Sequence, residues 1–553
     1  MLKLQITVPA GEAGAGSVAA GWEFDGKRWT APSGWFEPFP HEALEHQMVA
    51  RQDGRGAFLV VRERAAGFTH QPDDFPAPRA GTGPLVLPPD RYRDRRAEAE
   101  SWPLGFTVID LTETGNHNGA GARGGVEVTC GAVSAAPLQL AAAGGVLHGS
   151  WDLLDLSAFW SADRLNLDDV TRFVVMRALY SSQTLLRDVL TLTERATARF
   201  DGTGLAITYP PPAEHALPRE LRPGADPVEV WERMLVEVTG RWAAATSGGV
   251  AVELSGGMDS AAVAVALAEL RGPGGSWSIR TGVLRLPGEP GEQQMSRRAD
   301  MIDVLELGAD VVVPIAEHAP FRPGGARRSG VPFTPRDGNT AEGSLVMQQQ
   351  LVEAGATTVF TGAAGDDLMG FRPEERQRLG QPRTLRPMPG WLGPAGRDAV
   401  ERLDQDPAPA PVLMYSILAG LEPRWPQTMR QGLWPVSPLA TPDLLRFTEQ
   451  LPLKWRRRKL LLRTYLARRG MAEATVWPVL RENFAPVMET AMRRWGVPLL
   501  TELVRGGTIL GDLGVIDPAA VLDACQDARA GGPVEGLSRP LMMETALRSV
   551  IGS

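Results

Sequence analysis

A glycine turn is the segment of this sequence best suited to binding a phosphate. An apolar run at residues 250–254 leads into Ser255-Gly256-Gly257-Met258-Asp259-Ser260, and an alanine-rich run follows at 261–270. This order predicts a buried strand, a tight turn and a helix. Adjacent glycines let the backbone approach an anion, and the helix start offers unpaired N–H groups at the positive end of its dipole. The turn is therefore predicted to cradle phosphate, the alternative being an ordinary strand-to-helix turn. It is not a Walker A motif, which requires Lys followed by Ser or Thr.

A second turn of small residues carries paired carboxylates. A strand-like run at 357–360 is followed by Thr361-Gly362-Ala363-Ala364-Gly365-Asp366-Asp367. Such carboxylates suit a hard cation such as Mg²⁺, and the alternative is an acidic helix start that stabilises the helix dipole. Apolar and helical patterns alternate from 250 to 361, which predicts a parallel sheet flanked by helices. Both turns would then lie at the carboxyl edge of that sheet, where ligands bind.

Composition narrows the class of protein. A chain of 553 residues is long enough for two or more domains, and its hydrophobic content of 43% is ordinary for a globular protein. No apolar run reaches the roughly 20 residues that span a bilayer, so we expect a cytoplasmic protein with no membrane partner. A net charge of −8 argues against nucleic acid as a partner. The last histidine is His318, so chemistry beyond it depends on carboxylates, Arg, Lys and Mg²⁺.

The chain divides into two parts by its patterns. Residues 1–215 are β-rich, with strands predicted at 58–62, 106–111, 126–129 and 205–209. A Pro-rich, charged linker is predicted at 213–226. In the second part, residues 372–411 are rich in Pro and Arg and are interpreted as an inserted mobile segment. Helical patterns resume from 412 to about 472.

Several motifs in combination resemble the asparagine synthetase family of ATP pyrophosphatases. That family has SGGxDS, then LPGxPD, then SGEGxDExFGGY, and here the second reads Leu286-Pro287-Gly288-Glu289-Pro290-Gly291. Residues 434–439 are similar to its RVPFLD, and 459–463 to its KxxLR. Residues 145–154 and 197–200 are similar to its glutaminase-like part. The resemblance implies an α/β protein: an N-terminal Ntn-like αββα sandwich at 1–215, and a C-terminal α/β parallel-sheet synthetase domain at 216–553 with a helical C-terminal part.

The same resemblance implies roles for individual residues. Mg²⁺ would be held by Asp259 and Asp366. The residues that would contact ATP are Leu254, Ser255, Gly256, Gly257, Asp259, Ser260, Leu284 and Gly362. Those with catalytic roles would be Asp367, Lys459 and Arg481.

Departures from the family pattern bear on the reaction. Glutamine-hydrolysing members carry Cys directly after the initiator Met, where this chain has Leu2, and Cys130 lies too far along to replace it. The first domain is therefore expected to be an inactive glutaminase-like scaffold. The family's Glu in the GEG motif is Ala363 here, and its Lys in KxxF is Arg481. These departures make the chain closest in kind to lasso-peptide cyclases and β-lactam synthetases.

The expected reaction is ATP-dependent amide formation through an acyl-adenylate. A lasso-peptide cyclase would join the N-terminal amine of a precursor core peptide to an Asp or Glu side chain, giving a macrolactam for antibiotic biosynthesis. A leader protease and a leader-binding protein would be its partners. The alternatives are a β-lactam synthetase, an ammonia-dependent asparagine synthetase and, more remotely, a tRNA-modifying ATP pyrophosphatase.

Overall fold

The computed structural model describes residues 1–8, 19–66, 75, 77–114, 123–133, 137–177, 179–243, 246, 249–272, 277–380 and 387–552. The chain forms two compact units. Unit 1 comprises residues 1–159, 180–214 and 406–412, and unit 2 comprises 160–179, 215–405 and 413–553. The division into domains at 1–215 and 216–553 stays a prediction. By compactness, residues 160–179 belong to unit 2 and residues 406–412 belong to unit 1. No helix among the described residues is long and apolar enough to cross a membrane.

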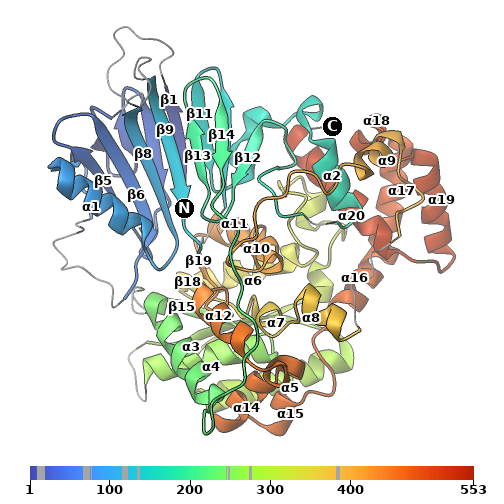
Figure 1. The fold of residues 1–553 in the computed structure, drawn as a ribbon. Helices are drawn as coiled ribbons and strands as arrows, with labels where there is room; N and C mark the ends of the chain where they lie inside the picture. The colour runs from blue at the N-terminus through green and yellow to red at the C-terminus, as the bar shows by residue number, and fades with distance from the viewer. Residues whose placement is uncertain are drawn as a thin grey trace. The chain divides into compact units, whose positions relative to one another are not determined.

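Unit 1 is built from two seven-stranded sheets, drawn from blue to green in Figure 1. The first has the order β12 (Val189–Leu192), β10 (Leu138–Ala143), β11 (Val146–Ser150), β1 (Leu2–Thr7), β4 (Gly34–Pro38), β3 (Trp29–Ala31), β2 (Glu23–Phe24). The second has the order β14 (Leu205–Thr208), β13 (Thr197–Phe200), β9 (Arg123–Cys130), β8 (Phe106–Thr114), β6 (Gly56–Glu63), β5 (Leu44–Arg51), β7 (Leu85–Leu87). All pairings are antiparallel except β5 with β7. The four strands predicted in this part are confirmed as β6, β8, β9 and β14.

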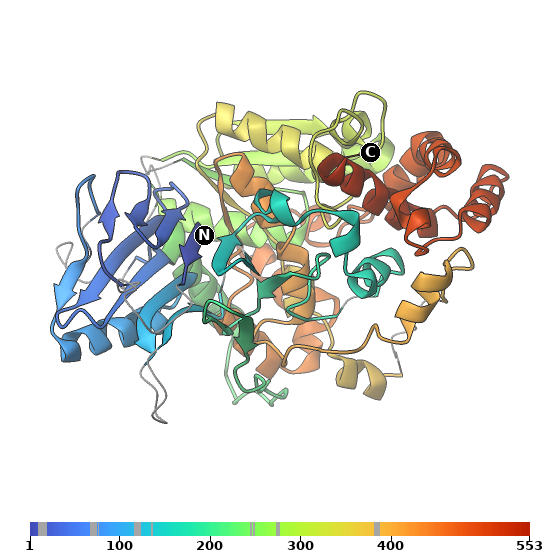
Figure 2. The ribbon, with the colours of Figure 1, turned by 90° about the horizontal axis from the view of Figure 1, so that it is seen from above.

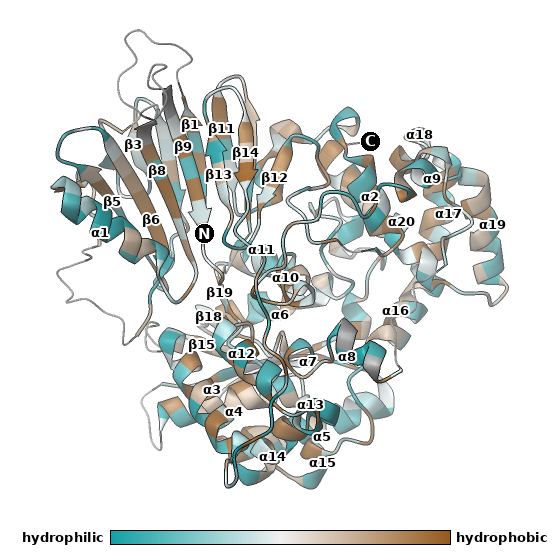
Figure 3. Cartoon of the chain, viewed as in Figure 1, coloured by the Kyte–Doolittle hydropathy of each residue, from teal (hydrophilic) through white to brown (hydrophobic). Residues whose placement is uncertain are grey.

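The core of unit 1 follows the apolar alternation of its strands. Every residue of β6 is buried, which explains its nearly continuous apolar sequence. Helix α1 (Pro89–Glu100) buries only Tyr92 and Ala99, and it is hydrophilic along its length in Figure 3. An αββα sandwich has a helical layer outside each sheet, whereas α1 is the one α-helix among the described residues of this unit. The two sheets are thus present, and the Ntn-like assignment stays a prediction.

Unit 2 contains the predicted parallel sheet. Its order is β17 (Asp310–Pro314), β16 (Arg280–Arg285), β15 (Val250–Glu253), β18 (Thr358–Phe360), β19 (Trp434–Val436), and all four pairings are parallel. Helices α3 (Pro227–Ala243), α4 (Met258–Arg271) and α5 (Gly288–Val304) lie on one face, and α6 (Ala341–Glu353) covers the other (Figure 2). Strand order therefore reverses between β15 and β18, which is the topological switch point of the sheet.

The remaining helices complete unit 2, and they confirm the helical C-terminal part. They are α2 (Leu167–Val174), α7 (Gly365–Leu368), α8 (Pro373–Arg378), α9 (Pro394–Val400), α10 (Tyr415–Leu421), α11 (Arg424–Arg430), α12 (Pro442–Gln450), α13 (Leu453–Arg456), α14 (Leu460–Arg468), α15 (Glu473–Val476), α16 (Ala485–Ala491), α17 (Val497–Gly506), α18 (Ile509–Asp512), α19 (Pro518–Arg529) and α20 (Glu535–Ile551). The linker predicted at 213–226 contains no helix or strand.

Two expectations differ from the structure. The helical pattern predicted from 412 to 472 is interrupted by strand β19, which is only three residues long and includes Pro435. Proline lacks the N–H needed inside a sheet, and β19 accommodates it because it is an edge strand. The Pro- and Arg-rich insert contains α8 and α9, and its residues 381–386 lie outside the described residues.

Candidate active site at the switch point of the parallel sheet

Both predicted turns lie at the switch point, because they follow adjacent parallel strands. Val252 of β15 pairs with Phe360 of β18, so the two strands end side by side. The SGGMDS turn leaves β15 and enters α4, and the TGAAGDD turn leaves β18 and enters α7. In doubly wound α/β sheets this crevice is where ligands bind.

The first turn is held by its two serines. The Ser260 hydroxyl accepts from the Ser255 N–H at 3.1 Å and lies 3.0 Å from the Ser255 hydroxyl, while Ser255 Oγ accepts from the Gly257 N–H at 3.2 Å. Gly256 has φ +88°, which side chains rarely adopt. The helix that follows has Gly257 at its N-cap and no side-chain cap. Its first N–H groups are thus available to an anion.

The second turn packs against the first through glycines. A Cβ added to Gly362 would lie 2.7 Å from the carbonyl carbon of Asp259, and one added to Gly365 would lie 2.5 Å from Asp259 Oδ1. No side chain fits at either distance. Ala364, between them, adopts φ +77° as the N-cap of α7. This left-handed alanine is a strained conformation of the kind that clusters at functional sites. The small residues of the motif therefore allow the Asp259 carboxylate to reach the second turn.

Lys459 joins the two turns. Its Nζ lies 2.5 Å from Asp259 Oδ2 and 2.6 Å from Asp366 Oδ1. Both Arg458 and Lys459 have left-handed backbones, with φ +53° and +54°. The buried Arg463 side chain donates to the Arg458 carbonyl at 2.6 Å, which helps to hold this conformation. Two consecutive left-handed residues that are not glycine indicate a backbone shaped to present Lys459.

The residues present fit a magnesium ion. Asp259 and Asp366 converge on one point, where the ammonium of Lys459 lies between them. Asp259 Oδ1 is buried and has no hydrogen-bond partner. Burial raises the pKa of the Asp259 carboxyl, and Asp366 and Asp367 raise it further against the opposing effect of Lys459. Mg²⁺ commonly takes one or two protein carboxylates and completes its shell with phosphate and water.

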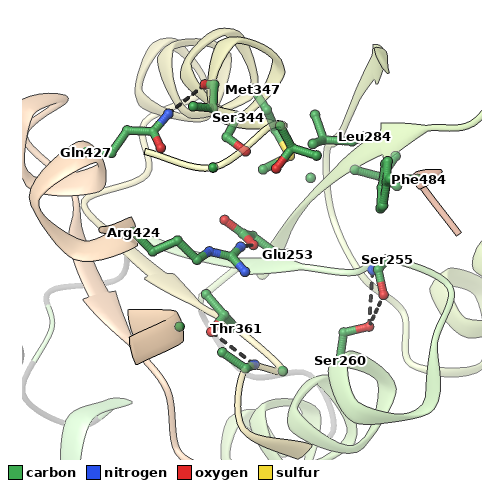
Figure 4. Close-up of a pocket in the computed structure, with 18 of the residues that line it drawn as sticks. Glu253, Ser255, Ser260, Leu284, Ser344, Met347, Thr361, Arg424, Gln427 and Phe484 are labelled. Atoms are coloured by element: carbon green, nitrogen blue, oxygen red, sulfur yellow. Dashed lines mark hydrogen bonds and ion pairs between the residues drawn. The ribbon is translucent and has the colours of Figure 1, made fainter. Parts of the chain in front are cut away.

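A cavity of about 530 Å³ opens in front of the two turns. Figure 4 shows Leu284, Met347 and Phe484 along one part of its wall, and Ser255 and Ser260 at its base. Its size lies in the range of small-ligand pockets. The apolar wall suits a heterocycle, and the serine turn suits phosphate.

A charged pair crosses this cavity. Arg424 at the start of α11 forms an ion pair with Glu253, the last residue of β15 (Figure 4). Glu253 is the one charged residue in an otherwise apolar strand, a signal that sequence reasoning could have used. Arg424 carried no such signal. Both side chains are placed to contact a bound ligand.

A carboxylate from the C-terminal segment lies against the first turn, Ser255–Ser260. Glu482 pairs with Arg297 of α5, and Arg297 Nε donates to the Gly256 carbonyl at 3.2 Å. A Cβ added to Gly256 would lie 3.2 Å from Glu482 Oε1. The buried side chain of Gln294 donates to the carbonyls of Ser255 and Leu284, at 2.9 and 3.2 Å. Sequence reasoning missed all three of these polar residues on α5 and in the loop.

The structure brings together some of the predicted residues and not others. Those that line the cavity are Ser255, Asp259, Ser260, Leu284, Gly362 and Asp366. Lys459 contacts two of them. Leu254 is fully buried, and Gly256 and Gly257 face Glu482 instead.

None of the three predicted catalytic residues is part of this cavity wall, although Lys459 contacts two residues that are. Asp367 accepts a hydrogen bond from the Ser416 hydroxyl. Arg481 is exposed, and its charge lowers the pKa of Arg463 after the larger effect of burial. Neither residue lines the cavity in the described part of the chain.

The chain was compared with protein-family models, curated proteins and solved structures. No protein-family model matches it, and no curated protein matches it. Among solved structures it is similar to the U34-tRNA thiolase NcsA from Methanococcus maripaludis with its [4Fe-4S] cluster, at 12% identity over 56% of this chain and 82% of that one, with a TM-score of 0.25. It is also similar to NAD⁺ synthetase from Burkholderia pseudomallei (20% identity, 45% and 90% covered, TM-score 0.19) and to NMN synthetase from Francisella tularensis (16% identity, 47% and 100% covered, TM-score 0.20).

Proposed function

We propose that this protein is an ATP-dependent, AMP-forming amide ligase. One observation carries the proposal: the turns after β15 and β18 meet at the switch point, so that Asp259, Asp366 and Lys459 converge beside a cavity of about 530 Å³. The chain has no P-loop lysine after the glycine turn. This combination supports cleavage of ATP between its α and β phosphates.

ATP would bind with its phosphates on the N–H groups of the Ser255–Ser260 turn and its adenine beside Leu284 and Gly362. Asp259 and Asp366 would hold Mg²⁺, which neutralises phosphate charge when bound. Lys459 would then lie next to the phosphates and stabilise the negative charge that develops as pyrophosphate leaves. The carboxylate substrate attacks the α phosphorus, so that an acyl-adenylate forms and pyrophosphate departs. An amine next attacks the acyl carbon, forming the amide and releasing AMP.

The substrate that we propose is a peptide whose own amine attacks its activated Asp or Glu side chain, as in a lasso-peptide cyclase. Ala363 offers no base for an external nucleophile, and an amine held beside the acyl-adenylate gains effective molarity instead. A leader protease and a leader-binding protein are the proposed partners.

Unit 1 has features that support an inactive glutaminase-like role. Leu2 is fully buried in β1 and carries no nucleophilic atom. Burial raises the pKa of the Cys130 thiol to about 12, and this thiol donates to the Thr193 carbonyl at 3.0 Å. A thiol with that pKa is not a nucleophile near neutral pH.

Product analysis tests the proposal. The enzyme is incubated with ATP, Mg²⁺ and candidate precursor peptides, and nucleotides are separated by chromatography. AMP and pyrophosphate should appear in a substrate-dependent manner, and ADP as that product would overturn the proposal. Supplying ¹⁵N-labelled glutamine or ammonia tests the intramolecular step. If the product carried ¹⁵N, the intramolecular step would be wrong and the protein would be an ammonia-dependent synthetase.

A further inference from the structure

A second cavity, of about 660 Å³, adjoins the proposed ATP cavity. The two share Thr340, just before α6, and Phe484, just before α16. The proposed binding of ATP and Mg²⁺ involves the first cavity and leaves the second without a role. A bound group could therefore extend from one cavity into the other past these two side chains.

The second cavity is mainly apolar. Its volume lies in the range of pockets that bind drug-sized ligands. It is roughly twenty times the space that one water molecule occupies in the liquid, about 30 Å³. Ammonia, which is the size of water, would not need such a space. The apolar residues that line it, besides Phe484, are Pro320, Phe321, Ala485, Met488, Met492, Pro533 and Val534. Two methionines in one wall suit an apolar ligand of variable shape.

The polar groups of this cavity favour a cationic donor. Two carboxylates line it, Glu489 and Glu535, and none of its described lining residues is Lys, Arg or His. Glu489 is paired at 2.8 Å with Arg493, which does not line the cavity. Both carboxylates are exposed, and a carboxylate ligand would meet two groups of its own sign among the lining residues, whereas an ammonium group would not.

Asn339 supplies an independent observation. It lines the same cavity beside Thr340, and its side-chain oxygen is buried with no hydrogen-bond partner. A buried acceptor left unsatisfied is unfavourable, and a ligand N–H donor would satisfy it. Asn339 directly precedes the shared Thr340 in sequence, and its unpartnered oxygen indicates a donor in the ligand.

We propose that this cavity binds the amine-bearing, apolar end of the acceptor, such as the N-terminal residues of a peptide. This inference rests on the proposed function, since the amine must reach an acyl-adenylate in the neighbouring cavity. The ammonium first loses a proton to solvent. Its nitrogen lone pair then attacks the acyl carbon, the C–N bond forms, and the bond from that carbon to the AMP oxygen breaks. AMP leaves with the electron pair, and the nitrogen loses its second proton to solvent.

Direct binding tests this assignment without any turnover. Leucyl-phenylalaninamide and its N-acetyl derivative are titrated into the full-length protein by calorimetry, in the absence of ATP. The free amine should bind at least tenfold more tightly than the acetylated compound. The double variant Glu489→Gln, Glu535→Gln should remove most of that preference. Equal binding of the two compounds would overturn the proposal.

A steric variant checks the location. Ser538, on α20, lines the second cavity and not the first, so Ser538→Trp should fill the second cavity and weaken binding of the free amine at least tenfold. Ser329→Trp, at an exposed position, is the matched control and should leave binding unchanged. Retained ATP binding in Ser538→Trp shows that the variant is folded. Unchanged amine binding in that folded variant would refute this cavity as the amine site. Amine binding without AMP formation would instead refute the proposed function alone.

Discussion

The ammonium of Lys459 lies 2.5 Å from the carboxylate of Asp259, a residue 200 positions earlier in the chain. The same ammonium lies 2.6 Å from Asp366. Three segments thus meet at one point: the start of α4, the start of α7 and the start of α14. The Asp366 side chain is 89% exposed, whereas that of Asp259 is 19% exposed, so one carboxylate is fixed in the wall and the other faces solvent. We propose that Mg²⁺ and phosphates would replace the ammonium at Asp366 while the buried Asp259 stays in position.

Asp259→Asn should reduce turnover by at least about 100-fold, because the amide lacks the charge needed to hold Mg²⁺ beside the phosphates. The fold should persist, since Asn preserves the shape of the side chain. Turnover is measured as pyrophosphate release. Asp303→Asn, an exposed position on α5, is the matched control and should leave the rate unchanged. Near-native turnover of Asp259→Asn would show that the carboxylate has no part in the reaction.

Gly365→Ala should abolish ATP binding. The new methyl group would lie 2.5 Å from Asp259 Oδ1, so either the second turn or the Asp259 carboxylate must shift. Affinity for ATP is measured by calorimetry, together with the thermal midpoint. Gly536→Ala provides the control, because a Cβ there meets nothing within 4 Å. An unchanged dissociation constant in Gly365→Ala would contradict the close packing of the two turns.

The two turns could be predicted from sequence because each is a local pattern. An apolar run, small residues and a helical run fix where the chain turns, and parallel strands place such turns on one edge. Lys459 was found only through its motif. Its contact with Asp259 spans 200 residues, and its left-handed backbone is not encoded in a periodicity.

The C-terminal segment shows where sequence reasoning stops. Arg481 and Glu482 are adjacent residues of the segment that was matched to the KxxF motif. Glu482 faces the Ser255–Ser260 turn, whereas Arg481 is exposed. Without a helix or strand at 481–484, no period indicates which side chain points inward. The Gln294 and Arg297 side chains were missed for a different reason. Their contacts are to backbone carbonyls of another strand or turn, which no motif reports.

Acidification should destabilise unit 1 through His46. Burial, and next the charge of Arg64, lower the pKa of His46 to about 4, and its Nδ1 accepts from Trp29 Nε1 at 3.1 Å. His46 therefore has a pKa near 6.5 in the unfolded chain and a pKa of about 4 in the folded protein. The contribution of His46 to the free energy of unfolding is therefore complete above pH 6.5. It decreases as the pH drops toward 4, by at most about 2 kcal/mol at pH 5.

Thermal midpoints at pH 8 and pH 5 measure this effect. Other groups also titrate in that interval, so the comparison is between the wild-type protein and His46→Gln. The variant removes the titrating ring, and its midpoint should fall less between the two pH values. An equal fall in both proteins would mean that His46 does not carry the pH dependence.

Glu482→Gln should tighten ATP binding. The Glu482 carboxylate lies where a Cβ on Gly256 would be only 3.2 Å away, so it repels phosphates that approach the turn. It also neutralises Arg297, a buried cation whose Nε donates to the Gly256 carbonyl in that turn. The amide keeps the shape but removes the repulsion and leaves Arg297 to the phosphates. We expect the dissociation constant for ATP to fall fivefold to tenfold, which corresponds to about 1 kcal/mol.

Arg297→Gln should act in the opposite direction, because it removes the cation and leaves the Glu482 charge unpaired beside the turn. The control for both variants is Glu473→Gln, an exposed position on α15. If Glu482 served chiefly to hold Arg297 in place, Glu482→Gln would weaken ATP binding as Arg297→Gln does. Opposite signs for the two variants therefore distinguish a carboxylate that competes with phosphate from one that only supports the arginine.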